Sequence, residues 1–248
     1  MTRAFSLGYN YRVMTYKDLS IVYEDNHLIV VVKPQGVPCC PDGTLDIDLL
    51  SLLKEYRKVN ENKPGDAYVG LIHRLDRPTG GVMAFAKTSK CAERMSAMIK
   101  NHEIEKKYLA ILDGTLRDKR GELVHYLKKD EKFNLVRVVG MATEGARRAA
   151  LKYKVLSEID GRSLVDIDLE TGRTHQIRVQ MATMGAPLQG DHKYGKSRGR
   201  EELALWAYQL KFVHPVTKET MTFRVYTPED SVFSSMDANR YLSLSVKD

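Results

Sequence analysis

The pattern of apolar and polar positions along the chain predicts more strands than helices. Two segments rich in β-branched residues, 21–23 and 28–33, are separated by Glu24-Asp25-Asn26-His27 and predict a hairpin. In 163–169 apolar and polar residues alternate, which is typical of a half-buried strand. Similar apolar segments predict further strands at 81–86, 108–112, 151–156 and 221–226.

Residues 46–56, 89–101 and 174–184 have the apolar spacing of helices. Ser89 is the expected N-cap of the second helix, and Gly185 is expected to end the third. Because the strands often follow one another without a crossover helix, the pattern favours an α+β fold with a mixed, mainly antiparallel sheet.

Composition and cysteine content narrow the class of protein. The 248 residues are 43% hydrophobic and 29% charged, as in a folded globular protein, and no apolar run approaches the length that spans a bilayer. The first twenty residues have no apolar segment of the kind that directs secretion. Cys39, Cys40 and Cys91 form no disulfide or metal-binding pattern, so we expect a cytoplasmic protein with reduced thiols and no metal.

The net charge of +7 is compatible with a polyanionic partner, although solubility alone would also explain it. Part of the excess is concentrated in 190–200, where four basic residues accompany the single acid Asp191. Charge therefore suggests nucleic acid without establishing it.

Residues 190–197 match the phosphate-binding pattern G-x-x-x-x-G-K-[ST] in every letter. That pattern works where a buried strand leads into the loop and a helix follows it. In this chain a predicted helix precedes the loop, Pro187 interrupts the connection, and Gly199 falls in what would be the first helical turn. We therefore interpret the segment as a basic loop rich in turns. A P-loop NTPase binding nucleotide at Lys196 stays as the alternative.

Residues 71–81 carry the densest group of chemically useful side chains. His73, Arg74, Asp76 and Arg77 precede Pro78 and two glycines, which predict a tight turn into the strand at 81–86. The neighbouring cations favour the ionised form of Asp76, which suits a nucleophile or a general base. The alternative is an Asx turn with a surface ion pair.

A second polar cluster, 171–178, lies where the third helix is expected to begin. Arg173 at its start could meet a phosphate together with free backbone N–H groups. Arg178, one turn into the helix, could reach inward to a carboxylate. The alternative is an amphipathic helix with a solvated basic face. Neither cluster identifies a function by itself.

Together these motifs resemble the RluA-type pseudouridine synthases. The resemblance lies in 73–81, in the strand Glu105–Ala110 and in 172–178, all in the order of the family. It continues on both flanks, in 21–36, 187–195 and 212–215. The family usually has Thr-Ser-Gly where this chain has Thr79-Gly80-Gly81.

The resemblance implies a pseudouridine synthase fold, in which two β-rich halves share a bent sheet with flanking helices and a central cleft. Asp76 would come from the first half and Arg178 from the second. We expect an irregular arm at 1–18, the catalytic domain at 19–230 and a C-terminal extension at 231–248. The short segment before the first strand leads us to expect no separate N-terminal RNA-binding module.

The implied activity is the isomerisation of specific uridines in rRNA or tRNA to pseudouridine, without a cofactor. Asp76 would be the catalytic carboxylate, either attacking the sugar or removing its 2′ proton to give a glycal. Arg178 would pair with Asp76 and keep it ionised. Tyr108 would stack on the uracil near C5 as a candidate acid or base. His73 is expected to be a structural hydrogen-bonding group.

RNA is the expected partner, bound by a monomer that associates with no membrane. Arg74 would fill the place that a flipped-out base vacates. A catalytically silent RNA-binding protein of the same fold is the alternative, and the intact set of Asp76, Tyr108 and Arg178 argues against it. The expected RNA contacts are Arg74, Arg77, Arg173, His175, Lys193, Lys196, Arg198 and Arg200.

Overall fold

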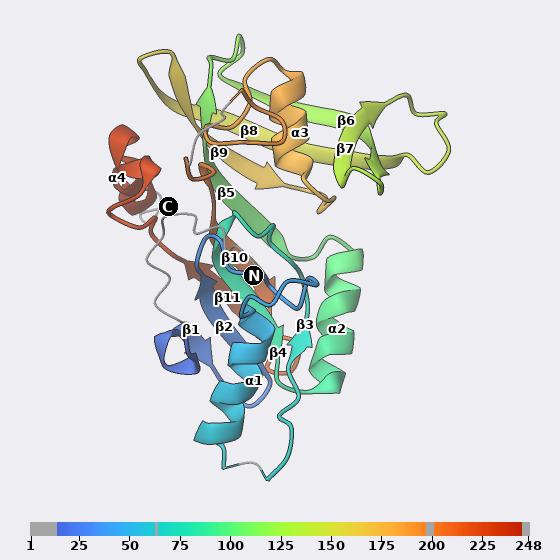
Figure 1. Cartoon of the computed structure of the whole chain (residues 1–248), viewed down its shortest axis with the longest axis vertical. Helices are drawn as coiled ribbons and strands as arrows, with labels where there is room; N and C mark the ends of the chain where they lie inside the picture. Colours follow the sequence, from blue (N-terminus) through green and yellow to red (C-terminus); the bar gives the residue numbers. More distant parts are fainter. Residues whose placement is uncertain (1–13, 63, 197–200, 245–248) are drawn as a thin grey trace, which may run out of the picture.

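The computed structural model describes residues 14–62, 64–196 and 201–244 (Figure 1). In this part of the chain eleven strands form one sheet, with β1-β2-β4-β10-β5-β9-β8-β6-β7 as its main path and with β3 and β11 pairing to β4 and β10. The mixed, largely antiparallel sheet confirms the expected α+β fold, because β10 and β4 are the single parallel pair among the described strands.

The first half of the sheet begins with the predicted hairpin, β1 (Ser20–Glu24) and β2 (Leu28–Lys33), and continues with β4 (Gly80–Ala86). Every residue of β4 is buried, which agrees with its unbroken apolar sequence. Helices α1 (Leu49–Asn60) and α2 (Ser89–Lys100) accompany these strands in the lower part of Figure 1.

The second half contains β5 (Glu105–Asp113), β9 (Arg162–Leu169), β8 (Arg147–Ile159), β6 (Arg120–Asp130) and β7 (Leu135–Val139). Helix α3 (Gln176–Thr183) lies against this half, in the upper part of Figure 1. Strands β6 and β7 were not predicted, because charged residues interrupt the apolar pattern of β6 and β7 has only five residues.

Strand β10 (Leu205–Val213) joins the two halves. It pairs with β5 along one edge, with β11 (Thr220–Arg224) along the other, and with β4 through two parallel pairs, Trp206 with Gly80 and Ala207 with Gly81. Gly81 has φ +126°, and a Cβ there would lie 2.2 Å from the carbonyl oxygen of Ala207. The joint therefore needs glycine at 81, both for the backbone angle and for the close approach of the strands.

One hydrophobic cluster spans both halves. It includes Ile29 and Met83 from the first half, and Val165, Ile167 and Ile177 from the second. Since the halves share a core as well as a sheet, loops from each half are held in a fixed relative position.

The other face of the sheet is covered by the C-terminal segment that was expected as an extension. A 3₁₀ turn at Val232–Met236 and helix α4 (Ala238–Leu244) place Phe233, Met236 and Leu242 against Leu109 and Trp206. Thus residues 232–244 contribute to the same folded body as β5 and β10.

All three predicted helix starts differ from the structure: α1 begins three residues later than expected, at Leu49, and the other two differ by one or two residues. The cap of α2 is Thr88, whose hydroxyl accepts a hydrogen bond from the amide of Cys91, and Ser89 is the first helical residue. Helix α3 begins at Gln176, because the left-handed backbone angles of His175 exclude that residue from the helix. Its end agrees with the prediction, since Gly185 has φ +81° just beyond the cap.

The tight contact at Gly80 predicts a stability effect. A Cβ at this position would lie 2.3 Å from Cζ3 of Trp206, so Gly80→Ala should lower the free energy of unfolding by about 1–3 kcal/mol. Urea denaturation should show a smaller penalty when Trp206→Leu is already present, because the two changes share the same space. Gly65→Ala, whose Cβ would have nothing within 4 Å, is the control. Equal unfolding midpoints for both glycine variants would contradict this explanation.

Candidate active site

Asp76 lies on a loop that several backbone hydrogen bonds hold in place between β3 (Gly70–Leu71) and β4. The amide of Thr79 donates to the carbonyl of Asp76 at 2.9 Å, closing a turn. The next carbonyl, that of Arg77, accepts from the amide of Gly36 at 2.9 Å and from Nζ of Lys33 at 3.0 Å. The catalytic candidate is therefore built on a rigid part of the chain.

Lys33 is a part of this arrangement that the sequence analysis missed. It is fully buried, and its Nζ also donates to the carbonyls of Pro34 and Val37 at 2.9 and 2.6 Å. Burial lowers the pKa of Lys33 to about 8. The single sequence signal was a lysine at the end of an apolar strand, which is equally common at a strand that simply ends at the surface.

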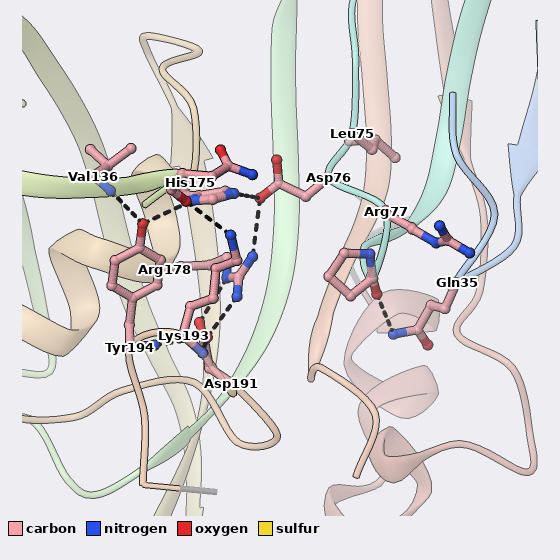
Figure 2. A network of polar contacts seen from close by, with 12 residues as sticks. Gln35, Leu75, Asp76, Arg77, Val136, His175, Arg178, Asp191, Lys193 and Tyr194 are labelled. Atoms are coloured by element: carbon pink, nitrogen blue, oxygen red, sulfur yellow. Dashed lines mark hydrogen bonds and ion pairs between the residues drawn. The ribbon is translucent and has the colours of Figure 1, made fainter. Parts of the chain in front are cut away.

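The Asp76 carboxylate faces two side chains from the second half of the molecule. Its Oδ2 lies 3.6 Å from Nη1 of Arg178 and 3.9 Å from Nε2 of His175 (Figure 2). The side chain of Asp76 is 27% exposed, so solvent and a substrate can reach it. Both contacts fall on Oδ2, and no side chain in the described ranges hydrogen-bonds to Oδ1.

Arg178 forms the expected ion pair with Asp76, but its nearest partner is Asp191. Nε and Nη2 of Arg178 donate to the two carboxylate oxygens of Asp191 at 2.8 and 2.7 Å, a bidentate contact. Asp191 is completely buried. Burial alone would raise its pKa, but the hydrogen bonds from Arg178 outweigh this effect and lower the pKa of Asp191. Against the opposing effect of burial, Asp191 likewise raises the pKa of Arg178.

Asp191 also explains why the loop at 190–197 does not act as a phosphate-binding loop, although its sequence matches the pattern. Oδ1 of Asp191 accepts from the amides of Lys193 and Tyr194 at 2.9 and 3.1 Å, and the amide of Gly195 donates to the Asp191 carbonyl at 2.9 Å. Amides that a P-loop would offer to a phosphate are instead bonded within the loop. The described part of this segment therefore does not support the P-loop alternative.

Tyr108 lies close to Asp76 because of the strand register. Tyr108 on β5 pairs with Ala207 on β10, which in turn pairs with Gly81 on β4, five residues after the carboxylate. The tyrosine is buried in the cluster that spans both halves. Burial first, and the negative charge of Asp76 second, raise the pKa of Tyr108. The phenol thus keeps its proton over the whole neutral range.

The two histidines near the site have different surroundings. His73 accepts a hydrogen bond at Nε2 from the amide of Ala84 at 3.2 Å, which confirms its expected role as a hydrogen-bonding group. Burial lowers the pKa of His73 to about 4, so the ring stays neutral and able to accept. The side chain of His175, expected to contact RNA, is 9% exposed and faces Asp76.

The remaining candidates for RNA contact differ in whether their side chains already form hydrogen bonds within the protein. Arg74 and Lys196 are exposed. The guanidinium of Arg173 donates to the carbonyl of Arg148, and Lys193 Nζ donates to that of Asn134. Arg198 and Arg200 lie outside the described residues.

Arg77 binds within its own chain. Its guanidinium forms an ion pair with Asp46, lies 3.6 Å from Asp42, and donates from Nε to the carbonyl of Gly36. We therefore regard Arg77 as a clamp between the loop that contains Asp42 and Asp46 and the loop that follows Asp76.

The described residues contain no group of three or more His, Cys, Asp or Glu side chains that could hold a metal ion. Among the helices in those ranges, none has the length and apolar character required to cross a membrane.

Comparisons with known proteins agree on one family. The family model of RNA pseudouridylate synthase matches residues 27–183. An uncharacterized RNA pseudouridine synthase of Bacillus subtilis, YhcT, is 35% identical over 225 residues, covering 87% of this chain and 70% of that protein. The ribosomal large subunit pseudouridine synthase D of Vibrio cholerae is 34% identical over 232 residues, covering 86% and 69%.

Solved structures show the same fold. A structure titled Human RNA Pseudouridylate Synthase Domain Containing 4 superposes with a TM-score of 0.74 at 24% identity and covers 90% of this chain and 95% of its own. A second human structure, Domain Containing 1, has a TM-score of 0.70 at 25% identity and covers 92% and 96%.

The buried pair of Arg178 and Asp191 generates a prediction. Asp191→Asn leaves a buried guanidinium without its charge partner and should lower the free energy of unfolding by about 3 kcal/mol, measured by chemical denaturation at pH 7.5. Because the folded pKa of Asp191 is lowered, this contribution is present above the unfolded pKa and disappears as pH falls through the folded pKa. The exposed pair of Lys119 and Glu158 provides the control, since solvent screens it and Glu158→Gln should cost much less. Equal losses in the two variants would refute the assignment.

Proposed function

The chain belongs to the RNA pseudouridylate synthase family, and on this premise we propose that Asp76 is the carboxylate with which it converts uridine in RNA to pseudouridine. The observation that carries the proposal is the position of Asp76. Its carboxylate is partly exposed on a rigid loop, and one oxygen faces an arginine from the other half of the sheet.

The reaction is an isomerisation within one nucleotide. The bond from C1′ of the ribose to N1 of uracil breaks, the base turns, and a bond from C1′ to C5 forms. The hydrogen on C5 leaves as a proton and N1 gains one, so no electron or group is exchanged with another molecule. The protein must therefore supply a carboxylate at the sugar, a hold on the detached base and a route for one proton.

Asp76 supplies the first requirement. With Oδ2 facing Arg178 and His175, Oδ1 is the oxygen presented to the ribose. It can either attack C1′ and form a covalent bond or remove the 2′ proton to give a glycal, and the geometry suits both routes. The cationic guanidinium attracts Oδ2 and so orients the carboxylate for either step.

Tyr108 meets the second requirement, and its phenol can take part in the third as a proton donor, not as the base that removes the C5 proton. Its ring belongs to the cluster between the Asp76 loop and α3, where a detached uracil could stack on it. Because its pKa is raised, the phenol is protonated and can serve as a hydrogen-bond donor to the turning base.

A uridine in folded RNA reaches this site only after it has left the stack of bases, which costs roughly a few kcal/mol. Arg74 is exposed two residues before Asp76, and its planar guanidinium can stack in the vacated position. Arg173, Lys193 and Lys196 lie on the segments that carry Arg178 and Asp191, where their charges can bind phosphates.

Relatives named ribosomal large subunit pseudouridine synthase D support rRNA as the substrate, with tRNA as the other outcome of a mapping experiment. Asp76, Tyr108 and Arg178 all come from one chain, which supports an active monomer. None of the proposed steps requires a metal, and we propose that the enzyme acts in the cytoplasm.

The test is to map pseudouridine in total RNA from cells that lack this protein, before and after incubation with the purified protein. Asp76→Asn should reduce product formation about 10³-fold or more, because the amide can neither attack the sugar nor take its proton. RNA binding should persist, since the carboxylate does not attract phosphate. Asp118→Asn, a change to an exposed acid outside the site, should leave the rate unchanged. A fully active Asp76→Asn variant would refute the proposal, and an inactive wild type would favour the silent RNA-binding alternative.

A further inference from the structure

His175 has a backbone conformation that few side chains adopt. With φ +50° and ψ +21° it occupies the left-handed region immediately before α3 begins. Residues other than glycine seldom adopt this region, although histidine, asparagine and aspartate do so more often than the rest. Its side chain is nevertheless nearly buried and faces the carboxylate of Asp76 (Figure 2). Both nitrogens of the imidazole have a partner nearby.

The other ring nitrogen of His175 is engaged by Tyr194. Nδ1 lies 2.8 Å from the hydroxyl of Tyr194, and the two rings meet edge to face with centroids 5.6 Å apart. The same hydroxyl accepts a hydrogen bond from the amide of Val136, on β7, at 2.8 Å. The tyrosine is thereby fixed between a strand of the second half and the histidine.

These contacts define where the proton of the imidazole sits. If Nδ1 carried it, the lone pair of Nε2 would point at an anion, which is unfavourable. If the Tyr194 hydroxyl donates its proton to Nδ1 while accepting from Val136, Nε2 carries the hydrogen and presents it to Asp76. The second arrangement satisfies every group, so the carboxylate and the tyrosine together select it.

We infer that His175 is a positioning residue for Asp76: Tyr194 fixes its tautomer, and its Nε2–H helps hold Oδ2 so that Oδ1 faces the ribose. The 3.9 Å separation is longer than a hydrogen bond, and the contact is expected to shorten during the reaction. This inference rests on the proposed role of Asp76.

Burial lowers the pKa of His175 and so keeps its ring neutral. Burial is the largest influence and lowers the pKa, and the cations Arg178 and Lys193 act in the same direction. Asp76 and Asp191 act in the opposite direction and only partly compensate. A neutral ring offers one N–H without adding a charge that would compete with Arg178 for the carboxylate.

Two amide substitutions, His175→Asn and His175→Gln, distinguish the roles of the two ring nitrogens. His175→Asn tolerates left-handed backbone angles and can keep a contact with Tyr194, but it loses the group at the position of Nε2. His175→Gln places an amide N–H close to the Nε2 position. Tyr194→Phe leaves His175 in place and keeps an aromatic ring 5.4 Å from the guanidinium of Arg178, while removing the hydroxyl that fixes the tautomer.

The experiment measures pseudouridine formation at the mapped site in total RNA from cells lacking this protein, over a range of RNA concentrations. His175→Asn should lower the rate at saturating RNA about tenfold and change the half-saturating concentration less than about twofold. His175→Gln should recover to within about threefold of wild type, because the donor is restored. Tyr194→Phe should slow the reaction about as much as His175→Asn does, and the double variant should be no slower than His175→Asn alone.

Three results would overturn the inference. One is an increased half-saturating concentration at an unchanged saturated rate, which would make His175 a phosphate contact. The others are a His175→Gln variant as slow as His175→Asn, and effects of the two positions that multiply in the double variant. Should His175→Asn fail to fold, as thermal unfolding would show, Tyr194→Phe still decides, because wild-type kinetics in that variant refute the inference. An active Asp76→Asn enzyme would instead refute the proposed function on which the inference rests.

Discussion

One guanidinium group lies between two carboxylates, and the site depends on it. Arg178 gives two of its nitrogens to Asp191 in a buried bidentate contact and leaves the third, Nη1, 3.6 Å from Asp76. A point charge could attract Asp76, but a planar fork whose orientation is fixed on one side also determines the direction of approach. Arg178 thereby orients the carboxylate of Asp76 as well as attracting it.

The sheet makes this contact possible. Asp76 precedes β4 and Arg178 lies on α3, so the two belong to different halves. Among the described strands, the pairing of β10 with β4 and β5 joins those halves into one sheet. The parallel pairing of β4 with β10 at Gly80 and Gly81 lies a few residues after Asp76. Ala207, which pairs with Gly81, also pairs with Tyr108 and so places the tyrosine near the carboxylate. Rigidity near the reactive group is expected of a site that must hold a detached base while it turns.

Much of this could be predicted from sequence, and the failures have physical reasons. Residues 73–81 and 172–178 carry side chains whose spacing is specific, so Asp76 and Arg178 could be recognised. Asp191 could not, because a single acid in a basic loop has no local signal of burial; its role depends on a contact with α3. The strands β6 and β7 were missed because β6 is interrupted by charged residues and β7 is short, so their pairing with each other and with β8 is what reveals them. His175 was assigned to RNA because a helix was expected to start before it, whereas its left-handed angles turn it toward Asp76.

The most direct measurement is the rate of Arg178→Lys at saturating RNA. Lysine keeps the positive charge but has no fork, so it can meet Asp191 or approach Asp76 but cannot hold both in the observed geometry. If the orientation of Arg178 is what positions Asp76, the rate should fall about a hundredfold or more, with RNA binding retained and the protein folded. A lysine variant that reacts within about threefold of wild type would show that charge alone is sufficient, and would contradict the central role of the guanidinium fork.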